Sequence, residues 1–151
     1  MVCLTLLRSR RVACAAPAYL THRGTPLDPH DLARHDCIRL VRGRRVFDLW
    51  RFHWNGAPLD VRVSGSLAST SGEVIHDWAL GGHGIAFKAE WDIADDLREG
   101  RLIECLSVYA VDEICLYGVY AANVLQPLRL RVLVDFMREQ LATFQMPKLG
   151  A

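Results

Sequence analysis

Two periodicities of apolar residues follow one another along the chain. Apolar residues recur at every second position in residues 50–54 and 61–67, which is the pattern of strands with one buried face. Residues 72–81 and 127–144 instead repeat their apolar residues at helical spacing. Strands that alternate with helices predict a layered α/β fold. The expected buried faces are Trp50, Phe52 and Trp54; Val61, Val63 and Leu67; Val74, Ile75, Trp78 and Ala79; and Leu130, Leu133, Met137, Leu141 and Phe144.

Turn and capping residues predict where these elements end. The Asn-Gly pair at residues 55–56 predicts a tight turn between two strands. Thr70 and Glu73 have the spacing of a capping box at the start of the helix that follows. Gly81 or Gly82 is expected to end the same helix in the left-handed conformation.

The composition indicates which classes of protein the chain can belong to. The chain has 151 residues, of which 51% are hydrophobic, and this is enough for one domain with its own core. A net charge of +1 does not suggest a polyanion binder. No apolar run reaches the roughly 18 residues that a membrane span needs. The five cysteines include no Cys-x-x-Cys pair, so we expect reduced thiols and a cytoplasmic protein with no membrane segment.

Common catalytic and metal motifs do not fit the chain. The glycine-rich residues 81–87 would need a third glycine where Phe87 stands, and they leave a helix rather than open one, so they are not a dinucleotide loop. His30 and His35 are five residues apart and do not share a helix face, and no His-Glu-x-x-His motif is present. The serine cluster lacks Gly-x-Ser-x-Gly. We therefore expect no catalytic residues, no metal site and no cofactor.

Arginines and aromatic residues mingle in residues 39–54, which raises the question of nucleic-acid binding. The aromatic residues there repeat with period two, however, as they do on the inward face of a strand. A charged loop followed by a core strand is the favoured interpretation.

The start of the helix at residues 72–81 is the best candidate for a binding site. Its first backbone N–H groups have no acceptor within the helix, and its dipole is positive there. Such a terminus suits a small anion, a carboxylate in particular. Ser69, Thr70 and Ser71 are the expected hydroxyl donors, with the N–H of Gly72 beside them. Ordinary N-capping by the same hydroxyl groups is the alternative.

An ordered set of motifs resembles the LysR-type transcriptional regulators. A strand is followed by Pro-x-Tyr-Leu, Gly-x-Pro, Pro-x-Asp-Leu and His-x-Cys-Ile in that order. The segments VSGSLASTSGEVIHDWALGGHGIAF and WDIADDLREGRLIECL are similar to later parts of the family's effector domain, so that the likeness runs from about residue 10 to residue 145. The matched positions of the first stretch are Pro17, Tyr19, Leu20, Gly24, Pro26, Pro29, Asp31, Leu32, His35, Cys37 and Ile38.

The resemblance implies a fold and a division of the chain. The family's effector domain is like a type 2 periplasmic binding protein, with two α/β subdomains joined by crossover strands and an effector bound between them. Residues 17–108 would form a complete second subdomain, while residues 1–16 and 109–151 would hold the crossover strands and a remnant of the first. The family's winged helix-turn-helix and most of its first subdomain have no counterpart, so we expect a truncated regulator without a DNA-binding domain.

The function that the resemblance implies is effector sensing for transcription rather than catalysis. The expected effector is small and anionic, and it would bind at Ser69, Thr70, Ser71 and Gly72, with the opposite wall supplied by the first subdomain. Other expected partners are a second copy of the chain or a full-length regulator, without direct DNA contact. The alternative is a stand-alone solute-binding or protein-interaction module derived from the same fold. His83 stands where the family commonly has an aliphatic residue, and its role is left open.

Overall fold

The computed structural model describes residues 1–121 and 128–142. The chain divides into two compact units, Arg11–Asp112 and Met1–Arg10 with Glu113–Ala151. The larger unit contains the mixed sheet and all four residues of the predicted anion site.

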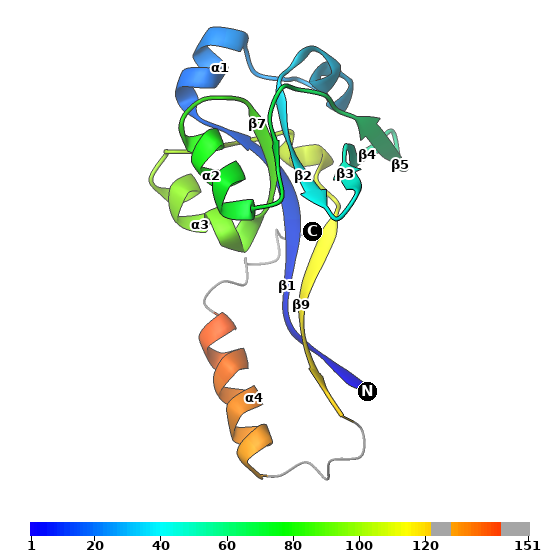
Figure 1. The fold of residues 1–151 in the computed structure, drawn as a ribbon, viewed down its shortest axis with the longest axis vertical. Helices are drawn as coiled ribbons and strands as arrows, with labels where there is room; N and C mark the ends of the chain where they lie inside the picture. Colours follow the sequence, from blue (N-terminus) through cyan, green and yellow to red (C-terminus); the bar gives the residue numbers. More distant parts are fainter. Residues whose placement is uncertain (122–127, 143–151) are drawn as a thin grey trace. The chain divides into compact units, whose positions relative to one another are not determined.

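Five strands form the central path of the sheet, in the order β3–β2–β7–β1–β8 (Figure 1). β2 and β7 are parallel, whereas β1 runs antiparallel to its neighbours β7 and β8. The short strand β6 pairs with β2 in parallel. This sheet, with helices following its parallel strands, confirms the predicted α/β layering. The bounds are β1, Val2–Ala15; β2, Cys37–Arg42; β3, Arg45–Phe47; β6, Ala68–Ser69; β7, Ile85–Ala89; and β8, Ile103–Cys105.

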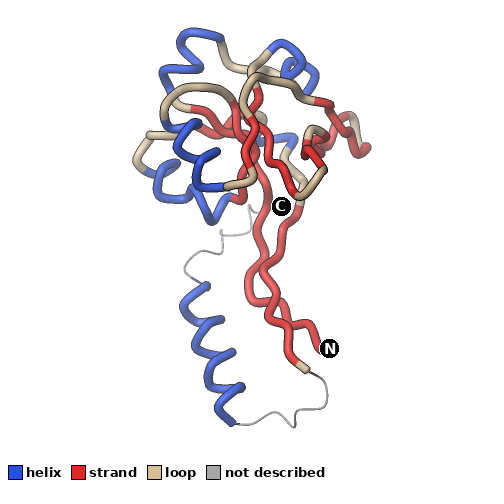
Figure 2. Tube along the Cα trace, viewed as in Figure 1, coloured by secondary structure: helices blue, strands red, loops and turns tan. Residues whose placement is uncertain are grey.

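Other elements pack on both faces of the sheet, and the side chains of β1 contact a different set of elements on each face. Successive side chains of a strand point to opposite faces. Val12 and Cys14 belong to a buried cluster with residues of α2 and α3, whereas Ala13 and Ala15 belong to a second cluster with α1, η1 and the β4–β5 hairpin. Figure 2 shows the helices and strands of this unit along the Cα trace. The bounds are α1, Pro17–Arg23; the 3₁₀ helix η1, Pro29–Arg34; β4, Leu49–Trp54; β5, Ala57–Arg62; α2, Gly72–Leu80; α3, Glu90–Arg98; and the 3₁₀ helix η2, Ser107–Tyr109.

The β4–β5 hairpin packs its aromatic face onto the sheet, as the period-two pattern predicts. Trp50 and Phe52 are buried, and Trp50 stacks on Phe87 of β7 with ring centroids 5.0 Å apart. Asn55 and Gly56 both have positive φ angles, of 50° and 78°, which is the type I′ geometry of a two-residue hairpin turn. The expected core strand is therefore confirmed, whereas the expected charged loop before it is wrong: Arg39 and Arg42 lie in β2 and Arg45 lies in β3, which pairs with β2.

All five cysteines lie among the described residues and are free. Cys14, Cys37 and Cys105 are buried. Burial raises the pKa of the Cys37 thiol to about 12 and that of the Cys105 thiol to about 11, so both are protonated near neutral pH. The three side chains pack as small hydrophobic residues.

The smaller unit contains an antiparallel ribbon and a helix. The first part of β1 pairs with β9, Glu113–Tyr120, and the register shifts between Thr5 and Leu7. The helix α4, Leu128–Leu141, confirms the last predicted helix, although none of its residues is buried. Phe144, the final residue of the predicted apolar face, lies outside the described residues. Within the described ranges no helix is long and apolar enough to cross a bilayer.

Gly84 allows β7 to start against the chain that leads into β2. Gly84 is buried, and a Cβ atom added to it would lie 2.5 Å from the backbone oxygen of Asp36. The N–H of Ile85 donates a 2.9 Å hydrogen bond to the same oxygen. A side chain at position 84 would therefore push apart the two parallel strands at their first hydrogen bond.

Substitution Gly84→Ala is expected to lower the free energy of unfolding by about 1–3 kcal/mol, because an overpacked backbone contact has to shift. Urea denaturation followed by circular dichroism measures this difference. Gly72→Ala is the matched control, because its added methyl group meets only Nζ of Lys88 at 3.5 Å. Equal stability of the two variants would contradict a steric role for Gly84.

Candidate functional site

The first turn of α2 lies at the edge of the sheet where the parallel strands end. Ser69 of β6 pairs with Leu40 near the carboxyl end of β2, and α2 begins three residues later. β7 runs parallel to β2 and leads directly into α3 (Figure 1). Both helices therefore begin beside the carboxyl ends of parallel strands, which is the edge where α/β sheets generally bind ligands.

Two serines hold the start of α2. Ser71 is the N-cap residue, and its hydroxyl accepts a 3.3 Å hydrogen bond from the N–H of Val74. The hydroxyl of Ser69 accepts a 3.1 Å hydrogen bond from the N–H of Ser71. The predicted capping box of Thr70 and Glu73 is therefore wrong by one residue, because Ser71 takes the extended backbone conformation and the capping bond that were expected of Thr70. The helix itself is confirmed, and Gly82, with a φ of 79°, supplies the left-handed residue after it.

The cap leaves hydrogen-bond donors available. Among the described residues, the N–H groups of Gly72 and Glu73 have no acceptor, as expected for the first two positions of a helix. Gly72 and Thr70 are exposed, and Ser71 is half-buried. Each serine hydroxyl accepts a bond but keeps its own hydrogen free to donate. The four predicted residues thus lie at and just before the start of α2, where the N–H groups of Gly72 and Glu73 have no acceptor among the described residues.

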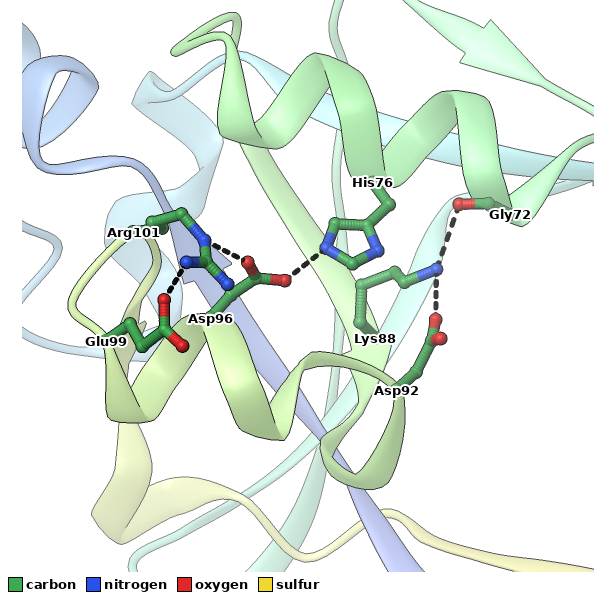
Figure 3. A network of polar contacts seen from close by, with 7 residues as sticks. All are labelled: Gly72, His76, Lys88, Asp92, Asp96, Glu99 and Arg101. Atoms are coloured by element: carbon green, nitrogen blue, oxygen red, sulfur yellow. Dashed lines mark hydrogen bonds and ion pairs between the residues drawn. The ribbon is translucent and has the colours of Figure 1, made fainter.

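Lys88 is a charged neighbour of this turn that the sequence analysis missed. Its ammonium donates a 2.9 Å hydrogen bond to the carbonyl of Gly72 and forms a 2.7 Å ion pair with Asp92 of α3 (Figure 3). The side chain of Lys88 is only 10% exposed. Lys88 is one of two lysines in the chain, beside 16 arginines, and this rarity was the only signal in the sequence.

A second polar group ties α2 to α3. Nε2 of His76 lies 2.5 Å from one carboxylate oxygen of Asp96, and Nε of Arg101 donates a 2.6 Å hydrogen bond to the other (Figure 3). Burial alone would raise the pKa of the Asp96 carboxyl, but the bonds from Arg101 and His76 outweigh it and hold that pKa below its ordinary value. The group thus connects α2 to α3 through the Asp96 carboxylate.

The remaining predicted features stay outside this site. His83 follows the last turn of α2, and nine helical residues span about 13 Å, so it lies at the opposite end of the helix from Ser71. Its N–H donates to the carbonyl of Trp78 in the helix-ending turn. Within the described part of the chain, no group of three or more His, Cys, Asp or Glu side chains is arranged to hold a metal ion.

Substitution Asp96→Asn is expected to lower the free energy of unfolding at pH 7 by about 1–3 kcal/mol, because Arg101 and His76 lose a charged acceptor. The folded-state pKa of Asp96 is depressed, so its contribution is present above the unfolded pKa of about 4 and is lost as pH falls through the lower folded value. The difference between the two proteins should therefore shrink below about pH 4. Urea denaturation at pH 3, 5 and 7 measures it.

The control is Asp95→Asn, which removes the surface pair with Arg98. Both partners of that pair are more than two-thirds exposed, so the change should cost well under 1 kcal/mol, at the level of ordinary surface pairs. A difference for Asp96→Asn that stays constant with pH would contradict the charge-based role of Asp96.

Comparison with known proteins gives a consistent result. The family model described as the LysR substrate binding domain matches residues 1–142. The HTH-type transcriptional activator TtdR of Escherichia coli is 35% identical over 132 residues, which are 87% of this chain and 42% of TtdR. The regulator DmlR of Escherichia coli is 28% identical over 142 residues, or 94% of this chain and 46% of DmlR. This chain thus spans a little under half the length of these curated relatives.

Solved structures agree with the sequence matches. The regulatory domain of CrgA, a LysR-type transcriptional regulator from Neisseria meningitidis, superimposes with a TM-score of 0.80 at 29% identity. The match covers 93% of this chain and 69% of that domain. The regulatory domain of AphB from Vibrio vulnificus, at 17% identity and a TM-score of 0.73, shows the same fold.

Proposed function

The chain belongs to the family of LysR substrate-binding domains, and we propose that it binds a small anionic effector at the first turn of α2. Family membership confirms the resemblance and the periplasmic-binding-protein-like fold that were expected from the sequence. The role in a transcriptional regulator is part of the proposal. The site, the charge of the effector and the partners are the proposed part.

The observation that carries the proposal is the pair of N–H groups of Gly72 and Glu73, which lack an acceptor among the described residues at an accessible helix start. A carboxylate there would accept both bonds and would be stabilised by the helix dipole. The hydroxyls of Ser69, Thr70 and Ser71 can add donors around it. Lys88 supports the anion further, since its ammonium lies against the same turn while Asp92 balances part of its charge.

We also propose a division of the chain along the lines expected from the resemblance. The unit Arg11–Asp112 encloses residues 17–108, assigned to the second subdomain. Residues 1–16 and 109–151 would supply the crossover strands and part of the first subdomain. In support, β1 and β9 pair as long antiparallel strands on either side of that unit in the sequence.

We extend the proposal to the type of protein, its cellular location and its partners. We propose a sensor rather than an enzyme, acting in the cytoplasm without direct DNA contact, with a second copy or a full-length regulator as its protein partner. In support, the relatives named above are transcriptional regulators. A stand-alone binding module is the competing function, and its effector site would be the same turn, so binding alone does not separate the two.

Substitution Gly72→Pro tests the site, because proline removes the N–H of the first helical residue and is accepted at that position of a helix. Ser71 already has the extended backbone that precedes proline, with φ −102° and ψ 120°. We expect the affinity for a small carboxylate to fall about 10-fold or more, the cost of one charge-assisted hydrogen bond. Isothermal titration of the whole chain with succinate, malonate and acetate measures it.

Gly72→Ala is the matched control, since it adds a side chain at the same position and keeps the N–H. Succinamide is the matched neutral ligand and should bind more weakly than succinate. If Gly72→Pro and Gly72→Ala bind the carboxylates equally well, or if no carboxylate binds the wild-type chain, the proposed site is wrong.

A further inference from the structure

We propose that the larger unit has a second ligand site, a pocket beside β3 that takes an organic monocarboxylate with an apolar body. The pocket has a volume of about 510 Å³. This size lies within the range of about 300–1,000 Å³ that is usual for small-molecule sites. Its lining residues are Arg11, Arg45, Val46, Phe47, Asp48, Leu49, Arg51, Asp60 and Asp112.

The pocket is separate from the first turn of α2. Its walls come from β3, β4, β5 and the first residue of the larger unit, Arg11. Arg11 alternates in β1 with Val12 and therefore points to the same face as Ala13 and Ala15, which is the face that the β4–β5 hairpin covers. α2 lies on the opposite face, with Val12. The two sites therefore lie on opposite sides of the sheet.

The ion pairs of the pocket leave one of its arginines without an acidic partner. Each of its three acids already has a cation: Arg51 makes two bonds to Asp60, of 3.0 and 3.4 Å, Arg11 pairs with Asp112 at 3.1 Å, and Arg62 pairs with Asp48 at 2.7 Å. The hydrogen bond from Arg51 also keeps the pKa of the Asp60 carboxyl below its ordinary value. Each acid that lines the pocket is thus paired with an arginine.

Arg45 is the cation left over. Among the described residues its side chain has no hydrogen bond or ion pair, and it is exposed. A free guanidinium presents a planar set of donors that matches a carboxylate with two parallel bonds. Of the three arginines that line the pocket, Arg45 is the one without an acidic partner, and a ligand carboxylate would supply that partner.

The remaining lining is apolar and uncovered. Val46, Phe47 and Leu49 are 42%, 41% and 50% exposed; they follow Arg45 in the sequence and line the same pocket. The guanidinium of Arg42 lies 5.3 Å from the centroid of the Phe47 ring and occupies one side of it. An inorganic anion would leave this apolar surface in water, whereas a carboxylate with a short hydrocarbon chain would cover it. The ligand class is therefore an organic monocarboxylate.

Amide chemical shifts of the whole ¹⁵N-labelled chain during titration with hexanoate test the proposal. Shifts are expected at Val46–Leu49 and at Arg51. Affinity at these amides should rise from acetate to butyrate to hexanoate, by up to about fourfold for each buried CH₂ group. Hexylammonium should leave the pocket amides unshifted, since it carries the wrong charge on the same chain. Equal shifts with hexylammonium, or affinity that does not grow with chain length, would overturn the proposal.

Two arginine variants locate the charge. Arg45→Gln should weaken hexanoate binding at the pocket amides about 10-fold, the loss of a charge-assisted hydrogen bond. Arg44→Gln removes a neighbouring exposed charge that does not line the pocket and should have no such effect. Both residues are on the surface, and circular dichroism checks that both variants stay folded. Equal losses in the two variants would show general attraction to a basic surface and would overturn the proposal.

The same titration separates this inference from the effector site. Hexanoate shifts confined to residues 69–73 would overturn the pocket and leave the α2 site standing. Shifts at Val46–Leu49 that persist when succinate leaves residues 69–73 unshifted would support the pocket and count against the α2 site.

Discussion

Burial of β1 on both faces is the constraint on which the larger unit depends. Val12 and Cys14 need apolar partners on one side, and Ala13 and Ala15 need them on the other. α2 and α3 supply the first set, and the aromatic hairpin with α1 and η1 supplies the second. The small alanine side chains leave room for Trp50 and Phe52 to approach the sheet. Because both layers rest on one strand, the start of α2 and the pocket beside β3 are held on opposite sides of a shared support.

The first turns of α2 and α3 and the contacts of Lys88 lie at the edge of the sheet where the parallel strands end. Chain direction places the first turns of α2 and α3 there, and each turn presents N–H groups that the helix itself does not use. Lys88, at the end of β7, then links the two helices through the carbonyl of Gly72 and the carboxylate of Asp92. His76, Asp96 and Arg101 repeat this linkage farther along the same helices. A rigid pair of helices keeps the donors of the cap in place, which a small anionic ligand requires.

Much of the fold was predictable because the signals are local. The helix at 72–81, the Asn-Gly turn and the inward face of Trp50 and Phe52 follow from spacing within a few residues. The cap was misplaced by one position, since Thr70 and Ser71 are both good N-cap residues and only the backbone path distinguishes them. The helix α1 was missed, because its seven residues are too few to show a period beside the strand that precedes them.

The sequence by itself determined most of the elements, the inward face of the aromatic hairpin, the family and the position of Ser69–Gly72 at the start of α2. Only the tertiary structure decided which polar side chains meet. Lys88 and Gly72 are 16 residues apart, and His76 and Asp96 are 20 apart, so no local pattern pairs them. The pocket beside β3 joins Arg11 and Asp112 to residues 45–60 in the same way. Periodicity records which face of an element is buried, whereas contacts between distant charges depend on how the sheet brings the elements together.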